Sequence, residues 1–247
     1  MYEFAQIFKR DLFNLLLNPM WTFYSSAFPF LMVLILGFLS SGGYGDSITS
    51  YDYYGVGILI FSIFNTAMTS ANSFMEERIK QGNLRIIYSP LPKGFIYTSK
   101  IAAAFVFSSF WHLIVVLLLQ LTLQVKFGGN YMGTVLLILM LVDLFASGLG
   151  VLFCCIFKSE NTANQLLSII ITFFALLGGA FFRLDGFGQA AETLSFLSPF
   201  KWIITDIFKI IYDGDFSYHL PTVLILVVLS VLSLLLCVKS YRTEDYV

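Results

Sequence analysis

Long apolar runs follow one another along the chain, separated by short polar segments. Each run is close to the roughly 20 residues that a helix needs to cross a bilayer, and none shows the alternation typical of a β-strand. The runs therefore predict six transmembrane helices, at residues 20–40, 54–75, 101–124, 132–157, 162–182 and 221–239. We expect an all-α membrane protein with a single membrane domain over residues 1–247.

The first 18 residues have the pattern of an amphipathic helix that lies on the membrane rather than across it. At about 100° per residue, Phe4, Phe8 and Leu12 fall on one arc, and Lys9 falls on the opposite arc. A helix of this kind rests in the interface with its apolar face in the acyl region. We expect an interfacial helix over residues 1–18, for which a simple anchoring role and a role in gating are both open.

The segment before the last apolar run, residues 183–220, is neither plainly soluble nor plainly spanning. Ser198 followed by Pro199 is typical of a helix start, and Gly214 marks a helix end. The segment between them is too short to cross a bilayer. We expect a re-entrant or interfacial helix there, with a shorter one at about residues 188–196.

The composition supports a membrane location. Of the 247 residues, 58% are hydrophobic and 12% are charged, and the mean hydropathy is +0.83. A soluble domain carries about 25% charged residues, so this chain has too little polar surface to cover a globule in water.

The basic residues fall unevenly between the predicted loops. With the N-terminus in the cytoplasm, ten lie inside and four lie outside, which satisfies the positive-inside bias. The inner residues are Lys9, Arg10, Arg78, Lys80, Arg85, Lys93, Lys100, Lys158, Lys239 and Arg242, and the outer ones are Lys126, Arg183, Lys201 and Lys209. The bias places both termini and the loop 76–100 in the cytoplasm, and residues 40–53, 125–131 and 183–220 outside.

One polar stretch is far longer than a chain reversal requires. It reads EERIKQGNLRIIYSPLPKG, residues 76–94, and mixes charges with glycine and proline. We expect another molecule to dock on it. The alternative is a surface loop whose basic residues bind anionic lipid.

The chain carries no recognisable catalytic motif. It contains no G-x-x-x-x-G-K-[ST], no H-E-x-x-H and no C-x-x-C, so we expect no active site, no metal site and no enzymatic activity in this chain. Asp143 is the sole charged residue well inside a predicted span, whereas ion-driven carriers need several such groups. Energy for uphill transport would therefore enter from outside the membrane, through the loop 76–100.

The residues of this loop resemble a pattern of the ABC-2 family of ATP-binding-cassette transporter permeases. In that family the loop carries, in this order, two glutamates, a basic residue, glycine, threonine or serine, two leucines, serine or threonine with proline and an aliphatic residue, and a lysine before the third span. The matching residues are Glu76, Glu77, Arg78, Gly82, Leu84, Ile87, Ser89, Pro90, Leu91 and Lys100. Asn83 stands where the family has Thr or Ser. The segment LSPFKWI, residues 197–203, is similar to a Ser/Thr-Pro-aromatic element of the same family.

The resemblance implies that the loop contains a coupling helix, seated in a groove of a separate ATPase subunit. Gly82 would reverse the chain, residues 83–88 would form the helix, and Pro90 would stop it. The residues expected to couple to the ATPase are Glu77, Arg78, Gly82, Leu84, Arg85, Ile87, Tyr88 and Pro90, with Leu84, Ile87 and Tyr88 as apolar anchors.

The resemblance also implies an assembly. A six-span permease of this family is half of a pore, so we expect a second permease chain, the same or related, and two P-loop ATPase subunits that hold ATP and magnesium. This chain itself would carry no cofactor and bind no nucleic acid. Small residues that allow close helix approach occur at FASGLG (145–150) and LGGA (177–180), where they serve either packing within the chain or the dimer contact.

The expected function is that of an exporter subunit in a bacterial plasma membrane. Its substrate would be hydrophobic or amphipathic, as a drug, an antimicrobial peptide or a lipid is, with a role in resistance. Two alternatives stay open: export of a polysaccharide or lipid-linked glycan, and a non-transporting anchor or sensor that recruits a cytoplasmic partner.

A separate expectation comes from the depth of two polar residues. Reflection about the tight turn between the third and fourth spans brings His112 and Asp143 to nearly the same depth on adjacent antiparallel helices. At 1.5 Å per residue, each lies roughly 16 Å from its starting surface, near the middle of a ~30 Å core. We expect them to pair. The alternative is that Asp143 is protonated, or bonded to serine or backbone groups, while His112 faces elsewhere.

Overall fold

The structure, a computed structural model, describes residues 2–45, 47–183 and 188–242, and this part of the chain is helical without a strand. Six of its helical segments are long and apolar enough to cross a membrane: Pro19–Leu39, Ser50–Met75, Gly94–Thr122, Gly129–Phe157, Glu160–Leu177 and His219–Ser240. The predicted all-α class and the six predicted spans are confirmed.

The helices follow one another with short connections. In chain order they are α1 (Tyr2–Leu16), α2 (Pro19–Ser25), α3 (Ala27–Leu39), α4 (Ser50–Met75), α5 (Glu77–Ile87), α6 (Gly94–Thr122), α7 (Met132–Phe157), α8 (Glu160–Leu177), α9 (Gln189–Ser195), α10 (Pro199–Phe208) and α11 (His219–Ser240). Short 3₁₀ turns lie at Ser41–Gly43 and Gly129–Tyr131, and a π-helical turn lies at Lys209–Asp213.

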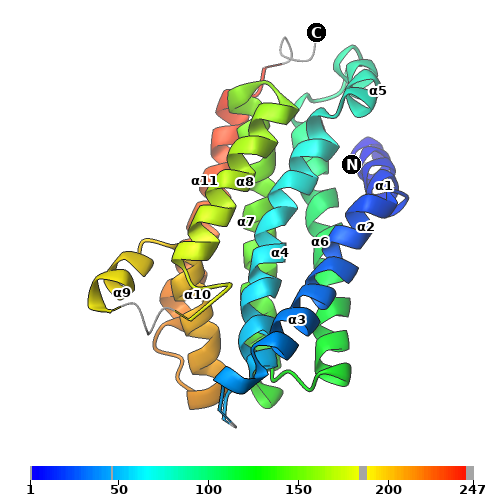
Figure 1. Cartoon of the computed structure of the whole chain (residues 1–247). Helices are drawn as coiled ribbons and strands as arrows, with labels where there is room; N and C mark the ends of the chain where they lie inside the picture. The colour runs from blue at the N-terminus through cyan, green and yellow to red at the C-terminus, as the bar shows by residue number, and fades with distance from the viewer. Residues whose placement is uncertain (1, 46, 184–187, 243–247) are drawn as a thin grey trace.

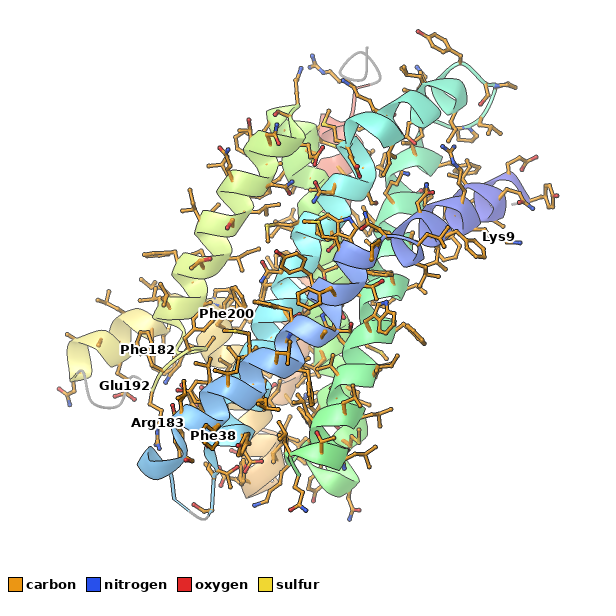
Figure 2. All side chains as sticks on the ribbon, turned by 45° about the vertical axis from the view of Figure 1, so that its right-hand side comes forward. Lys9, Phe38, Phe182, Arg183, Glu192 and Phe200 are labelled. Carbon is orange, nitrogen blue, oxygen red and sulfur yellow. The ribbon has the colours of Figure 1, made fainter. Side chains whose placement is uncertain are left out.

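The spans run side by side, and the short helices gather at their two ends (Figure 1). The α5 end carries α1, α5 and the last turn of α11. The α9 end carries α9, α10 and the connections from α3 to α4 and from α6 to α7. Phe38, Phe182 and Arg183 lie at the α9 end (Figure 2). The loops that we expected to share a side of the membrane therefore lie at the same end of the molecule.

The first span is broken, which the apolar run did not predict. Helices α2 and α3 are separated at Ser26, whose φ and ψ are −124° and −72°. Pro29 follows in the first turn of α3 and has no N–H for the carbonyl of Ser25, four residues earlier. At the same break, the Ser26 hydroxyl donates to the carbonyl of Thr22, at 2.5 Å.

Helix α4 is the central helix of the bundle. It begins with a capping box between Thr49 and Asp52, and it packs against α3, α6, α7 and α8. Helix α7 approaches it closely, because a Cβ at Gly150 would overlap the carbonyl oxygen of Ala67. A Cβ at Gly148 would in turn press on Ser233 of α11. The small residues at 145–150 thus pack within the chain.

Helix α1 is amphipathic, as predicted, but its buried face includes a charge. The Asp11 carboxylate accepts hydrogen bonds from Lys100 Nζ at 2.5 Å and from Ser99 Oγ at 2.7 Å, and all three side chains are buried. Lys100 lies inside α6, which begins at Gly94 rather than near residue 101. We expected Lys100 in the loop 76–100, just before the third span; it lies within that span because α6 extends further toward the loop than its apolar run suggests.

The segment before the last span contains the two predicted short helices. The Ser198 hydroxyl accepts from the backbone N–H of Phe200 at 3.2 Å and caps α10, with Pro199 in its first turn. The π-helical turn that continues α10 ends at Gly214, whose φ of 62° is in the left-handed region that suits glycine. Helix α9 precedes them over seven residues.

Candidate functional site

Helix α5 projects past the ends of the spans and is tied to α4 (Figure 1). The chain turns at Glu76, where φ is −55° and ψ is 135°. Asn83 is almost fully buried, and its side-chain amide donates to the carbonyl of Phe74 at 3.3 Å. Carbonyls in the last turn of a helix lack a partner within that helix. Asn83 therefore caps the end of α4 from the middle of α5.

This geometry corrects the expected shape of the loop. The helix covers Glu77–Ile87 instead of residues 83–88, and Gly82 lies within it rather than at a chain reversal. Glycine inside a helix costs about 1 kcal/mol relative to alanine, which does not outweigh the contacts of the helix with the bundle. The reversal takes place at Glu76, and Pro90 lies two residues after Tyr88, the C-cap of the helix.

The expected coupling residues occupy different environments. Leu84 and Ile87 are partly buried and pack against the core of this chain, whereas Tyr88 is 78% exposed and Pro90 is exposed. The side chains of Glu77, Arg78 and Arg85, and the surroundings of Gly82, lie outside the part that the structure describes. The contact of these residues with an ATPase stays a prediction.

A cavity of about 370 Å³ lies between the first span, α4 and α8. Aromatic and methionine side chains form much of its wall, and every residue that lines it is uncharged. The lining residues are Met20, Trp21, Tyr24, Ser25, Phe28, Phe61, Ser62, Asn65, Thr66, Met68, Thr69, Asn72 and Asn164.

The polar side of this cavity is a stripe along α4. The stripe consists of Ser62, Asn65, Thr66, Thr69 and Asn72, which are spaced by three or four residues and so share one helix face. The sequence analysis missed it. The helical period of hydroxyl and amide residues inside an apolar run was the available signal.

An amide pair joins the stripe to α8. The side-chain nitrogen of Asn164 donates to the side-chain oxygen of Asn72 at 2.8 Å. The side-chain oxygen of Asn164 is buried and has no hydrogen-bond partner among the described residues. The amide pair therefore fixes one wall of the cavity by joining α4 to α8.

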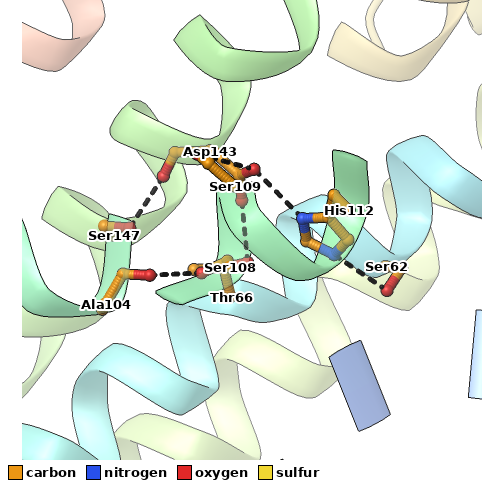
Figure 3. A network of polar contacts seen from close by, with 8 residues as sticks. All are labelled: Ser62, Thr66, Ala104, Ser108, Ser109, His112, Asp143 and Ser147. Atoms are coloured by element: carbon orange, nitrogen blue, oxygen red, sulfur yellow. Dashed lines mark hydrogen bonds and ion pairs between the residues drawn. The ribbon is translucent and has the colours of Figure 1, made fainter. Parts of the chain in front are cut away.

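The structure brings His112 and Asp143 together behind the same stripe (Figure 3). His112 Nδ1 lies 3.0 Å from Asp143 Oδ2, and both side chains are nearly fully buried. Thr66 donates to the other carboxylate oxygen at 3.0 Å, and Ser109 donates to Oδ2 at 3.3 Å. With its proton on Nδ1, the imidazole accepts at Nε2 from the Ser62 hydroxyl, 3.2 Å away.

This cluster and the cavity share two residues. Ser62 and Thr66 line the cavity and also bond to His112 and Asp143. The pair therefore fixes the hydroxyls that a bound molecule meets, while it joins α4, α6 and α7. Within the described residues, no group of three or more His, Cys, Asp or Glu side chains could hold a metal ion.

Comparison with known protein families gives a match over most of the chain. The model of the family described as "ABC-2 type transporter" matches residues 2–212, which include α5, the cavity and α10. Among curated proteins, no match was found.

Proposed function

The chain belongs to the ABC-2 type transporter family, and we propose that it is the membrane subunit of an ATP-driven exporter in a bacterial plasma membrane. A permease of this family is a transport subunit rather than an enzyme, and its family implies an ABC ATPase as partner. Two copies of that ATPase, with ATP and magnesium, would serve two permease chains, the same or related.

The observation that carries this proposal is the role of α4 as a link. One end of α4 is capped by Asn83 of α5, and the middle of the same helix presents the polar stripe to the cavity. A push on α5 would therefore be transmitted to the cavity wall through one continuous helix of 26 residues. The α5 end is then the cytoplasmic side, in accord with the distribution of basic residues.

The cavity favours an amphipathic substrate. It combines aromatic walls with hydroxyl and amide groups and lacks a charged residue among its lining. Its volume of about 370 Å³ falls in the range of small-molecule sites, about 300–1,000 Å³. A drug, a lipid or part of an antimicrobial peptide suits it, and a second permease chain facing the cavity would complete the path.

Substrate-stimulated ATP hydrolysis tests the function. The tagged chain, expressed from its native locus, should co-purify with an ABC ATPase, and amphipathic compounds should stimulate the reconstituted complex. Replacement of Asn65 by Leu and Thr69 by Val should reduce the stimulation, whereas Leu232→Val, on an exposed face of α11, should not.

Other outcomes would change the assignment. Stimulation by lipid-linked glycans alone would favour glycan export. A chain that recruits a cytoplasmic protein other than an ATPase would contradict transport and favour the anchor or sensor.

Thiol labelling tests the sidedness. The native cysteines Cys154, Cys155 and Cys237 are buried and can be replaced by serine or alanine. On that background an impermeant reagent added to whole cells should label Asn130→Cys and not Tyr88→Cys, since the two exposed positions lie at opposite ends. The reverse pattern would contradict the orientation.

A further inference from the structure

A second cavity lies at the α9 end, separate from the cavity beside the α4 stripe. Its volume is about 280 Å³, just below the range of sites for whole drug-sized ligands. Its walls come from the start of α4, the turn that follows α8, and the segment from α10 to the π-helical turn. Its size suits a chemical group rather than an entire substrate.

Three basic residues line this cavity, and the ammonium groups of the two lysines also lie over neighbouring rings, that of Lys201 over Phe196 and that of Lys209 over Tyr218. Four basic residues lie in the segments at the α9 end of the molecule. Lys126 is one of them, and the other three, Arg183, Lys201 and Lys209, line the cavity. Two carboxylates oppose them in part, because Asp213 also lines the cavity and Asp215 lies 3.4 Å from Lys209. Asp52 and Lys126 both lie beside Tyr212 and offset each other, so these residues together retain a positive excess of one charge.

Aromatic rings form the rest of the wall. Phe208 stacks between Tyr53 and Tyr212, with ring centres 6.1 Å and 5.8 Å apart and interplanar angles of 26° and 15°. On the other side the Arg183 guanidinium lies over the ring of Tyr44, 5.5 Å from its centre. The cavity thus offers an apolar surface beside its cations.

The tyrosines add no negative charge to the cavity. Burial raises the pKa of Tyr44, with a further contribution from its hydrogen bond to Tyr54. Burial, followed by the nearby Asp52 carboxylate, raises the pKa of Tyr212. Both phenols therefore remain protonated at neutral pH and leave the charge of the cavity to its lysine, arginine and aspartate side chains.

The cavity lies where three spans end. Tyr53 is in the first turn of α4, Gly178 and Gly179 directly follow α8, and Lys209 precedes α11 by ten residues. The ends of spanning helices coincide with the headgroup level of a bilayer, where amphipathic rings and long cations are favoured. Phosphate is the anionic group most abundant at that level.

We propose that this cavity binds the phosphate group of an amphipathic molecule, with Arg183, Lys201 and Lys209 as its ligands. Arginine and lysine donate charge-assisted hydrogen bonds to phosphate oxygens, and the stack of Tyr53, Phe208 and Tyr212 receives the adjoining glycerol or alkyl part. Membrane phospholipid and free phosphate are the two possible sources of this group.

Native mass spectrometry of the full-length chain in detergent measures the binding. The probes are dioleoylphosphatidylglycerol and dioleoylglycerol, which share their tails and differ in the phosphate-containing headgroup. The wild type should retain the phospholipid over the neutral lipid. Replacement of Arg183, Lys201 and Lys209 by Gln should reduce that retention at least about tenfold, since charge-assisted hydrogen bonds are lost.

Two control variants separate this site from general charge effects. Lys239→Gln removes an exposed basic residue at the opposite end of the molecule, and it should keep the retention. The double variant Lys201→Arg and Lys209→Arg keeps all three positive charges and should retain the phospholipid as the wild type does. Equal retention of both lipids by the wild type, or unchanged phospholipid retention in the triple Gln variant, would overturn the proposal.

Excess inorganic phosphate distinguishes the sources. Displacement of the phospholipid by phosphate identifies the anion alone as sufficient, and continued retention identifies the lipid-attached headgroup as the ligand; either result supports a phosphate site. Because the measurement uses no ATP and no partner, its failure is distinct from a failure of the transport proposal.

Discussion

The imidazole of His112 and the carboxylate of Asp143 lie 3.0 Å apart on neighbouring spans, and neither is exposed to solvent beyond a few per cent. The hydroxyls of Thr66 and Ser109 also donate hydrogen bonds to this carboxylate. The cluster therefore satisfies a charge that would otherwise be costly within the membrane.

A double-mutant cycle tests the coupling in this pair. His112→Gln and Asp143→Asn should each lower the free energy of unfolding by up to about 3–5 kcal/mol, because each leaves a buried polar partner unsatisfied. The double variant should lose less than the sum of the two. Unfolding of the purified protein in mild detergent measures this, and strictly additive losses would show that the two residues do not interact.

The buried pair of Asp11 and Lys100 should hold α1 against α6. Asp11→Asn leaves the Lys100 ammonium buried without a counter-charge, and we expect a loss of about 3–5 kcal/mol. Asp11→Leu combined with Lys100→Met removes both charges and should recover much of that loss. Glu3→Gln, an exposed change on the same helix, serves as the control.

Limited proteolysis provides a second readout for this pair. If α1 depends on the ion pair, Asp11→Asn should accelerate cleavage within residues 2–16, and the double apolar variant should not. Equal cleavage rates in all variants would show that apolar contacts alone hold α1.

Asp206 should make stability depend on pH. It is fully buried on α10, both carboxylate oxygens lack a hydrogen-bond partner among the described residues, and His219 Nδ1 is 3.9 Å away. Burial raises its pKa, against a smaller lowering by Thr222, His219 and Lys209 and a raising by Asp215. Between the ordinary and the raised pKa the folded state binds more protons than the unfolded state, so stability falls as pH rises through that window.

Asp206→Asn should remove this dependence. The variant should be at least as stable as the wild type at neutral pH, and its melting temperature should change less between acidic and neutral pH. Glu192→Gln, at an exposed acidic residue of α9, is the control. If the melting temperatures of the wild type and of Asp206→Asn change equally with pH across this window, Asp206 is not the group responsible.

Tyr88 should contact the ATPase partner. It is the exposed residue among the expected apolar anchors, so Tyr88→Asp should weaken co-purification of the ATPase by about tenfold or more without unfolding the chain. Tyr88→Phe should keep most of the binding. Tyr2→Asp, at an equally exposed tyrosine of the same end, controls for added charge, and an equal effect there would argue against a specific contact.

The lengths of the apolar runs predicted the six spans, because a bilayer imposes that length on every helix that crosses it. The same rule predicted the shared depth of His112 and Asp143. Depth alone does not give side-chain direction, so the bonds from Thr66 and Ser109 could not be foreseen.

Other features depended on tertiary contacts that no local pattern records. Asp11 is buried because Lys100 meets it from α6, 89 residues away in the sequence. Gly82 lies in a helix because the flanking residues pack on the bundle. The break at Ser26 had a visible cause in Pro29, but the continuous apolar run around it obscured the signal.

ATP hydrolysis at the α5 end should drive the transport of an amphipathic molecule across the membrane. The most direct test is transport of a fluorescent amphipathic substrate in proteoliposomes that contain the chain and its co-purified ATPase, with ATP added only outside. Complexes with α5 outward should move the dye inward, with no movement under a non-hydrolysable ATP analogue or in Tyr88→Asp. Dye movement that is equal with and without ATP hydrolysis would contradict the account.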